Sequence, residues 1–237
     1  MNRIQEEIRH FRSLEHIWFG QKTVAGQRRY DNRGVLFRKY CKPRETDKIL
    51  EIGCGEGEFT NRLKRIGARV TAIDITPAVI DRSEKKLTFK GLNYKIDNCE
   101  SLSFKDSSFS IVCGISILHH VNLRKTLREV FRVLTPGGRI FFTEPNIVNP
   151  IMYAQTNIGW LRKRMESSPR ERALLRTDVE RAMKNVGFHH VEVNNYDFLF
   201  PWIPEFMIIP LEKAGNILER IAIIKEFSGS LLIYAVK

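Results

Sequence analysis

The chain has 237 residues, of which 43% are hydrophobic, enough for one globular domain with a sizeable core. It contains no run of about 18 apolar residues, and its charged start lacks the apolar stretch of a secretory signal, so we predict a cytoplasmic protein. The formal net charge of +12 favours an anionic partner, such as nucleic acid, a membrane surface or a phosphorylated substrate.

The positive charge is concentrated in two flanking segments. Residues 1–45 hold eleven Lys or Arg against five Asp or Glu, and residues 161–184 hold eight against four. The two segments account for +10 of the +12, so the rest of the chain is close to neutral.

The first residues predict an amphipathic helix, because Ile4, Ile8, Phe11, Ile17 and Trp18 recur at roughly helical spacing. Two interpretations stay open. The helix packs on the domain, or it covers an active site or a membrane surface. Together with the basic stretch that follows, it makes residues 1–45 an N-terminal helical cover.

From residue 48 to residue 146, short apolar runs alternate with helical patterns. The runs predict strands at 48–53, 69–75, 92–97, 109–118 and 137–146. The helical patterns lie between them, at 58–67, 76–91 and 123–134. Thr76 and Pro77 suit the N-cap and the first position of the second helix. This alternation is typical of right-handed βαβ units, so we predict an α/β fold whose mostly parallel sheet carries helices on both faces.

The pattern changes after residue 146. An irregular insertion spans residues 147–171. It is followed by a predicted helix at 176–188 and a predicted strand at 189–200. A second insertion at 201–227 is apolar, is interrupted by prolines and contains one predicted helix, and a last strand follows at 229–237. We predict a single domain over 1–237, with a cofactor-binding core at 46–146 and the two insertions on the acceptor side, where such folds carry their function.

A glycine-rich turn follows the first predicted strand. Gly53, Gly55 and Gly57 read GxGxG, and glycines there let backbone amides approach a ligand. Such turns serve both dinucleotide and phosphate sites. Asp74 ends the second predicted strand, where a carboxylate can accept hydrogen bonds from two ribose hydroxyls. The alternative interpretation of Asp74 is a helix cap.

These motifs resemble the class I S-adenosylmethionine-dependent methyltransferases of the small-molecule type. The matching text is "LEIGCGEGEFT", "VTAIDITPAVI", "DNCESLSFKDSSFSIVCGISILHH" and "LREVFRVLTPGGRIFFTEPN". The resemblance covers residues 48–146 closely and implies a Rossmann-like, seven-stranded sheet with an antiparallel last strand. "FTEPNIVNP", "SSPRERA", "YDFLFPWIP" and "GSLLIYA" also resemble a bacterial subgroup often found beside saccharide or natural-product assembly enzymes.

The resemblance implies S-adenosylmethionine as the cofactor and assigns residues to its parts. Glu51 and the turn would lie against the methionine part, Asp74 would hold the ribose, and Ile75 would pack on the adenine. The implied cofactor residues are Glu51, Gly53, Cys54, Gly55, Gly57, Asp74, Ile75, Asn98 and Cys99. Asn98 departs from the commoner aspartate, although its amide oxygen can still accept a hydrogen bond from the adenine amino group.

Three residues are candidates for acid–base chemistry, which an oxygen acceptor needs. His119 and His120 follow the fourth predicted strand, and a histidine can take a hydroxyl proton near neutral pH. His120 is favoured slightly because it lies farther from the buried strand. Glu144 ends the fifth predicted strand and either faces the cleft or caps the following turn.

Further residues are candidates for the acceptor site or its lid. Arg28, Arg29 and Tyr30 precede the first predicted strand and can close over an anionic group, or they form a solvated basic face. Tyr153, Trp160 and Trp202 lie in the two insertions and suit an acceptor pocket, although such aromatics also serve as ordinary core.

These observations favour an S-adenosylmethionine-dependent methyltransferase acting on a hydroxyl or amine of a small molecule, such as a sugar or a lipid-linked saccharide. The expected partners are the small-molecule acceptor and, because basic flanks accompany apolar insertions, an anionic membrane surface at which the protein is peripheral. An RNA methyltransferase is an alternative that basicity supports but that lacks an RNA-binding appendage. A second alternative is a non-catalytic module that binds the cofactor. The cysteines are spaced too widely for a zinc knuckle, so we predict buried free thiols and no metal.

Overall fold

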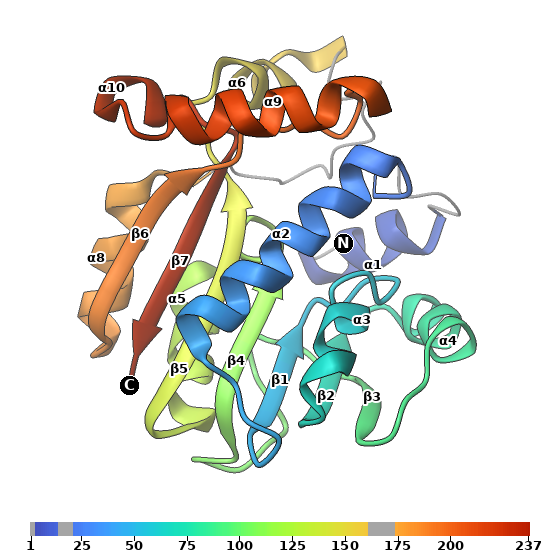
Figure 1. Cartoon of the computed structure of the whole chain (residues 1–237). Helices are drawn as coiled ribbons and strands as arrows, with labels where there is room; N and C mark the ends of the chain where they lie inside the picture. The colour runs from blue at the N-terminus through green and yellow to red at the C-terminus, as the bar shows by residue number, and fades with distance from the viewer. Residues whose placement is uncertain (1–2, 14–20, 161–173) are drawn as a thin grey trace.

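The computed structural model describes residues 3–13, 21–160 and 174–237, and these residues contain one seven-stranded sheet (Figure 1). The strands are β1 (Lys48–Ile52), β2 (Arg69–Asp74), β3 (Leu92–Ile96), β4 (Phe109–Ile115), β5 (Leu134–Pro145), β6 (His189–Tyr196) and β7 (Ser230–Val236). Their order in the sheet is β3-β2-β1-β4-β5-β7-β6, and β7 runs antiparallel to both β5 and β6. The predicted α/β fold with an antiparallel last strand is confirmed.

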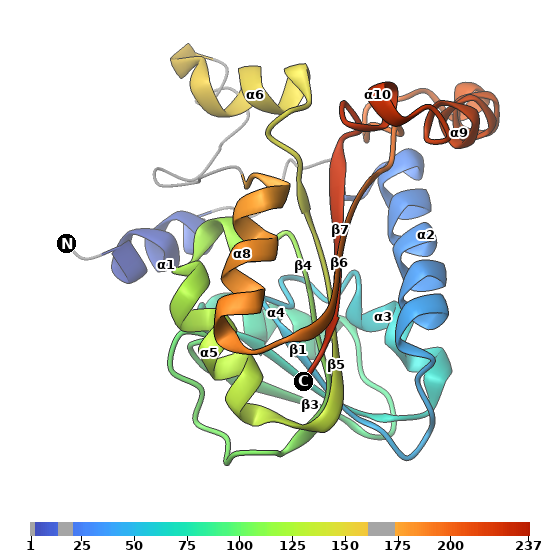
Figure 2. The ribbon, with the colours of Figure 1, turned by 90° about the vertical axis from the view of Figure 1, so that its left-hand side faces the viewer.

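Helices cover both faces of this sheet, as the edge-on view shows (Figure 2). The helices are α1 (Arg3–Ser13), α2 (Val24–Cys41), α3 (Thr60–Leu63), α4 (Pro77–Lys86), α5 (Leu123–Val133), α6 (Pro150–Asn157), α8 (Arg176–Val186), α9 (Glu205–Leu218) and α10 (Ala222–Lys225), with short 3-10 helices η1 (Lys64–Ile66) and η2 (Leu118–His120). Helices α2 and α3 lie on one face, and α5 and α8 on the other.

The strand sequences explain why both faces are covered. Phe141 and Phe142 are adjacent in β5 and both fully buried, one packing with α2 and α3 and the other with α5 and α8. Strands buried on both faces read as continuous apolar runs because neither alternating set of side chains meets water. Two cores, one on each face, therefore hold the sheet rigid.

The register of the sheet brings separate motifs together at its carboxyl edge. Ile52 pairs with Ile73, so the glycine turn after β1 lies beside Asp74 at the end of β2. Ile115 pairs with Thr143, so residues 116–120 after β4 lie beside Glu144 near the end of β5. Helices α6, α9 and α10 stand beyond this same edge (Figures 1 and 2).

The structure corrects several predicted elements. The segment 147–171, predicted to be irregular, contains the regular helix α6, and its residues 161–171 lie outside the described part of the chain. The segment 201–227 holds two helices, α9 and α10, instead of one. The predicted strands 109–118 and 189–200 end early, because Ser116 (φ +55°) and Asp197 (φ +74°) turn the backbone away from the sheet.

Other predictions concern single side chains. All four cysteines are buried and free, as predicted. Thr76 occupies the N-cap position of α4, but its side chain makes no cap hydrogen bond. Of the predicted N-terminal stripe, Ile17 and Trp18 lie outside the described residues, while α1 carries the rest. No helix in the described part of the chain is both long and apolar enough to cross a bilayer.

Candidate active site

The glycine turn of residues 53–57 has a backbone that other residues could not adopt without strain. Gly53 has φ +65°, and a Cβ there would lie 2.6 Å from the Cδ1 atom of Ile117, so the position admits no side chain. Gly55 has φ +53°, and a Cβ there would meet no protein atom within 4 Å. Protein atoms therefore pack against the turn at Gly53, whereas the space beside Gly55 holds no protein atom and can admit a ligand.

A buried carboxyl group that forms no ion pair with another described residue lies directly before this turn. Glu51 is 2% exposed, and Thr60 Oγ1 donates a hydrogen bond to its Oε2 atom at 2.6 Å. Burial disfavours the charged form and raises the pKa of Glu51 to about 8. A cationic ligand group in this place would stabilise the carboxylate, so the site fits a ligand that carries an ammonium group.

The buried Glu51 carboxyl predicts an unusual dependence of stability on pH. Its pKa is near 4.5 in an unfolded chain and about 8 in the folded protein, so the folded state holds more protons between these values. We expect the free energy of unfolding of ligand-free protein to fall across this range relative to Glu51→Gln, by up to roughly 4 kcal/mol at pH 8. Denaturant unfolding of both proteins at several pH values checks this, and parallel curves would refute it.

Asp74 connects the glycine turn to helix α4. Its Oδ1 atom accepts a hydrogen bond from the Thr76 amide at 2.9 Å, and its Oδ2 atom accepts one from the Gly55 amide at 3.3 Å. Burial raises the pKa of this carboxyl, while the backbone donors act in the opposite direction. Asp74 thus orders the turn before α4 through the amide of the N-cap residue Thr76, without being the cap itself, and it also lines the cavity described next.

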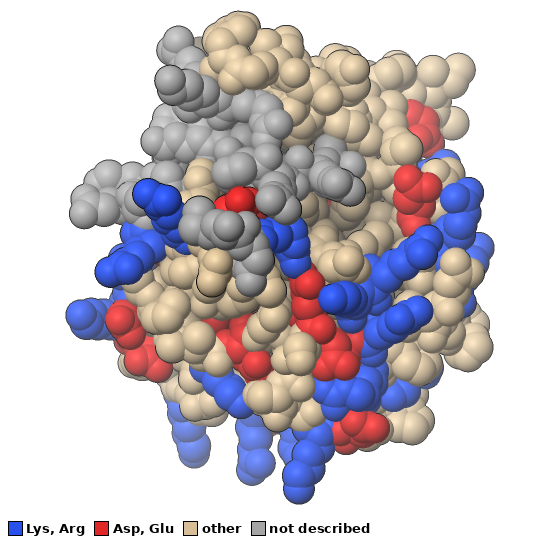
Figure 3. All heavy atoms as spheres, turned by 180° about the vertical axis from the view of Figure 1, so that it is seen from behind, with Lys and Arg blue, Asp and Glu red and all other residues tan. Residues whose placement is uncertain are grey.

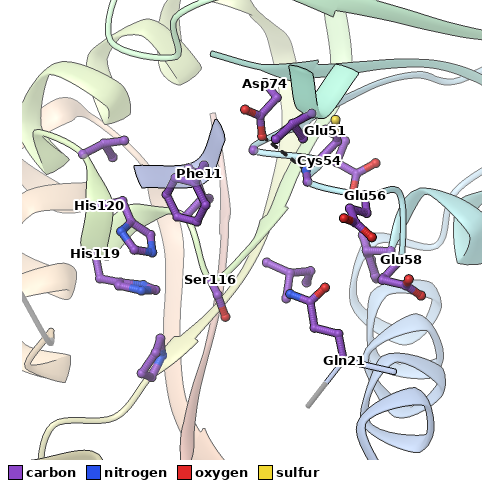
Figure 4. Close-up of a pocket in the computed structure, with 18 of the residues that line it drawn as sticks. Phe11, Gln21, Glu51, Cys54, Glu56, Glu58, Asp74, Ser116, His119 and His120 are labelled. Carbon is purple, nitrogen blue, oxygen red and sulfur yellow. Dashed lines mark hydrogen bonds between the residues drawn. The ribbon is translucent and has the colours of Figure 1, made fainter. Parts of the chain in front are cut away.

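A cavity of about 250 Å³ opens beside the turn, and most of the predicted cofactor residues line it. Those present are Glu51, Gly53, Cys54, Gly55, Asp74, Ile75, Asn98 and Cys99. Gly57 is not among the lining residues. The Oδ1 atom of Asn98 accepts a hydrogen bond from the Glu100 amide at 2.9 Å, which orders the loop after β3. Figure 4 shows the acids near the turn on one side of the cavity, opposite two histidines.

One of those histidines is held by a buried carboxylate. His119 Nδ1 lies 2.6 Å from Glu144 Oε2, and both side chains are almost completely buried. Glu144 Oε1 accepts hydrogen bonds from the Ile117 and Leu118 amides at 2.9 and 2.8 Å. Since a carboxylate only accepts, Nδ1 carries the proton in this contact and Nε2 is left as the basic nitrogen. His119 lines the cavity, so this nitrogen belongs to a ring at the site.

The second histidine contacts the N-terminal helix. His120 Nδ1 lies 3.5 Å from Glu7 Oε2, and Phe11 packs edge-on against its ring at 5.4 Å between centroids. Arg3 donates to the His120 carbonyl at 2.5 Å and pairs with Glu100. Helix α1 therefore lies over the cavity and contributes Phe11 to its lining, as Figure 4 shows.

The predicted acceptor or lid residues divide into two groups. Arg29, Tyr30 and Trp202 line the cavity. Three others do not: Arg28, Tyr153 and Trp160. Arg28 points away because its guanidinium binds both carboxylate oxygens of Glu212 on α9.

Sequence reasoning missed Arg33, which also lines the cavity. Its guanidinium is buried and lies 5.2 Å from the centroid of the Tyr30 ring. Arg29 and Arg33 are four residues apart, and such spacing places them on the same side of a helix. This spacing can be read from the sequence, but the sequence alone did not indicate which side of α2 faces the cavity. Buried guanidinium groups suit the carboxylate of a ligand.

Comparison with known proteins finds methyltransferases. Residues 50–142 match the family described as a methyltransferase domain. The ubiquinone/menaquinone biosynthesis C-methyltransferase of Zymomonas mobilis is 35% identical over 46% of this chain and 46% of its own length. A ubiquinone biosynthesis O-methyltransferase of Methylocella silvestris is 32% identical over 58% of this chain and 60% of its own. The chain thus spans about half of these relatives' lengths.

Solved structures share the fold. A Haemonchus contortus phosphoethanolamine N-methyltransferase 2, in complex with S-adenosylmethionine, superposes with a TM-score of 0.66 at 18% identity, covering 96% of this chain and 60% of that one. A SAM-dependent methyltransferase from Archaeoglobus fulgidus has a TM-score of 0.61 at 18% identity, covering 88% and 94%. At this identity the likeness concerns the fold alone.

Proposed function

We propose that this chain is a class I S-adenosylmethionine-dependent methyltransferase and that it transfers the methyl group of S-adenosylmethionine to a hydroxyl or amine of a small molecule. The observation that carries this proposal is that one cavity is lined by both the glycine turn with Asp74 and the Glu144-supported His119. This arrangement supports a donor site and a base side by side.

The residues near the turn suit each part of the cofactor. Glu51 would hold the ammonium group, and the guanidinium of Arg29 or Arg33 would hold the carboxylate. Asp74 would accept hydrogen bonds from the ribose, while Ile75, Asn98 and Cys99 would contact the adenine. When bound, the cofactor supplies an activated methyl group on a sulfonium, so the protein's part is to align the acceptor atom and to exclude water.

The His119 and Glu144 pair supplies the acid–base chemistry that a hydroxyl acceptor needs. Glu144 holds the imidazole in the tautomer whose Nε2 atom can accept a proton. His119 would take the hydroxyl proton as the acceptor receives the methyl group that the bound cofactor supplies, so the imidazole would become positively charged. Glu144 stabilises that charge. We favour His119 over His120 because only His119 contacts this carboxylate among the described residues.

The acceptor end of the cavity suits a molecule with an apolar portion. Phe11, Met152, Phe200 and Trp202 line it, with Gln155 as a polar neighbour. This lining supports a hydroxyl-bearing group attached to an apolar body, of which a lipid-linked saccharide is one example. A peripheral contact with an anionic membrane would bring the enzyme to such an acceptor.

The test is transfer of labelled methyl from S-adenosylmethionine into a cell extract that is then separated into lipid, small-molecule, nucleic-acid and protein pools. Asp74→Ala is the blank. We expect label that depends on Asp74 in the lipid or small-molecule pool. Nuclease-sensitive label would instead favour the RNA alternative. Absence of label above the blank across several extracts, although calorimetry shows cofactor binding, would favour a non-catalytic module.

A further inference from the structure

The end of the molecule beyond the carboxyl edge of the sheet exposes many large apolar side chains. They belong to the segments 150–160, 198–204 and 205–227, whose helices α6, α9 and α10 are placed at one end by Figures 1 and 2. We call this set the apolar end face: Ile151, Tyr153, Trp160, Trp202, Phe206, Ile209, Ile217, Ile221, Ile223 and Phe227. Phe206 and Ile223 are 80% and 77% exposed. Exposed apolar patches of this extent mark interaction sites in soluble proteins.

Two of the segments that form this face carry no charge. Residues 145–160 and 198–204 contain no charged residue. Figure 3, which shows the molecule from behind, has few charged side chains among the coloured residues of its upper end, and many Lys and Arg over its lower part.

Helix α9 and the two residues after it, Glu219 and Arg220, carry acids and cations on different sides. Glu212 turns inward to Arg28 and Asn32, and Glu219 accepts a hydrogen bond from the Asp197 amide. Lys213 and Arg220 are exposed, and neither forms an ion pair with another described residue. Apart from Glu205 in its first turn, the outward side of α9 is therefore apolar and cationic.

The apolar end face is continuous with the lining of the cavity. Trp202 lines the cavity and is 48% exposed, and its ring stacks on Phe200 at 4.8 Å between centroids. Met152 of α6 lines the cavity, while its neighbours Ile151 and Tyr153 are exposed. A surface that covered the end face would thus lie against the acceptor side of the cavity.

We propose that the apolar end face docks onto an anionic lipid bilayer, with α6 and α9 in the headgroup region, and that the acceptor enters the cavity from the bilayer past Trp202. Apolar side chains bordered by Lys and Arg are the composition that such an interface binds. In a two-fold contact with a second copy, Lys213 and Arg220 would be buried with few acids opposite them, which is unfavourable. The entry route rests on the proposed function, whereas the docking does not.

Vesicle binding of the full chain tests the docking. We expect flotation with vesicles of phosphatidylcholine containing about one third phosphatidylglycerol, and much weaker flotation with phosphatidylcholine alone. In a variant that keeps only Trp202 (Trp18→Phe with Trp160→Phe), brominated lipid should quench the indole fluorescence. Absence of flotation, or binding without quenching, would overturn the proposal.

Variants of the end face separate this contact from general basicity. Phe206→Glu with Ile223→Glu, and separately Lys213→Glu with Arg220→Glu, should each weaken vesicle binding by about tenfold or more. The matched controls are Val35→Glu on the exposed side of α2, and Lys64→Glu with Arg65→Glu in η1, away from the end face. An equal loss in the controls would contradict docking through this face.

Two further measurements distinguish docking onto lipid from association with a second copy and from damage to the cofactor site. Sedimentation velocity without lipid should show the same monomeric species for the parent protein and for Phe206→Glu with Ile223→Glu. A dimer that this variant abolishes would assign the face to a second copy instead. Calorimetry should show unchanged S-adenosylmethionine affinity in the end-face variants. Because vesicle binding is measured without turnover, it can fail or succeed independently of methyl transfer.

Discussion

We expect Gly55→Ala to weaken S-adenosylmethionine binding by about 10- to 100-fold while the protein stays folded. The Gly55 amide donates to Asp74, and the residue lines the cavity. A Cβ there would meet no protein atom within 4 Å, so its methyl group would occupy open space at the cavity. The substitution therefore removes space from the ligand without creating a clash inside the protein. Calorimetric titration with S-adenosylmethionine measures the effect.

Gly137→Ala is the matched control for this substitution. Gly137 also has a positive φ, +72° against +53° at Gly55, and a Cβ there also meets nothing within 4 Å. Both alanines should cost about 1 to 2 kcal/mol of stability from left-handed backbone alone. Gly137 does not line the cavity, so only Gly55→Ala should lose affinity. Equal affinities in the two variants would place the cofactor away from the turn.

Gly53→Ala would be a less informative experiment. A Cβ at Gly53 lies too close to Ile117 for the fold to remain unchanged. A loss of binding in that variant would therefore mix a local rearrangement with a change in the ligand site.

The parts of the site that were predicted from sequence are those set by local pattern. The glycine turn and Asp74 lie at the ends of strands whose apolar runs are continuous, so their positions follow once the strands are recognised. The parallel register of β1 and β2 then brings them together. The buried cysteines likewise follow from their apolar surroundings.

The parts that were not predicted depend on contacts between distant segments. The choice between His119 and His120 depends on Glu144, which approaches only because β4 pairs with β5. Arg28 was grouped with Arg29, but the phase of α2 turns one toward α9 and the other toward the cavity. Helix α6 was not predicted, because the composition around it suggested an irregular segment. Its start could have been recognised, since Asn149 is a favoured N-cap residue and Pro150 suits the first helical position.

We expect Glu144→Gln to lower kcat by about 10²- to 10⁴-fold with little change in S-adenosylmethionine affinity. The Ile117 and Leu118 amides require an acceptor, so they should keep the glutamine oxygen and leave its NH₂ group facing His119. Nδ1 of His119 would then have to accept a hydrogen bond, which moves the ring proton to Nε2 and removes the base. Turnover of the acceptor identified in the extract assay measures the loss.

A purely structural role for Glu144 predicts a different set of results. If the carboxylate acts through His119, then Glu144→Gln should cost little further activity in a His119→Ala background, since both changes remove the same base. The acidic limb of the pH–kcat profile should also vanish in both variants. His120→Ala should retain that limb and most of the activity. Additive losses, or an unchanged pH profile, would show that Glu144 only supports the backbone after β4 and that the acceptor proton leaves by another route.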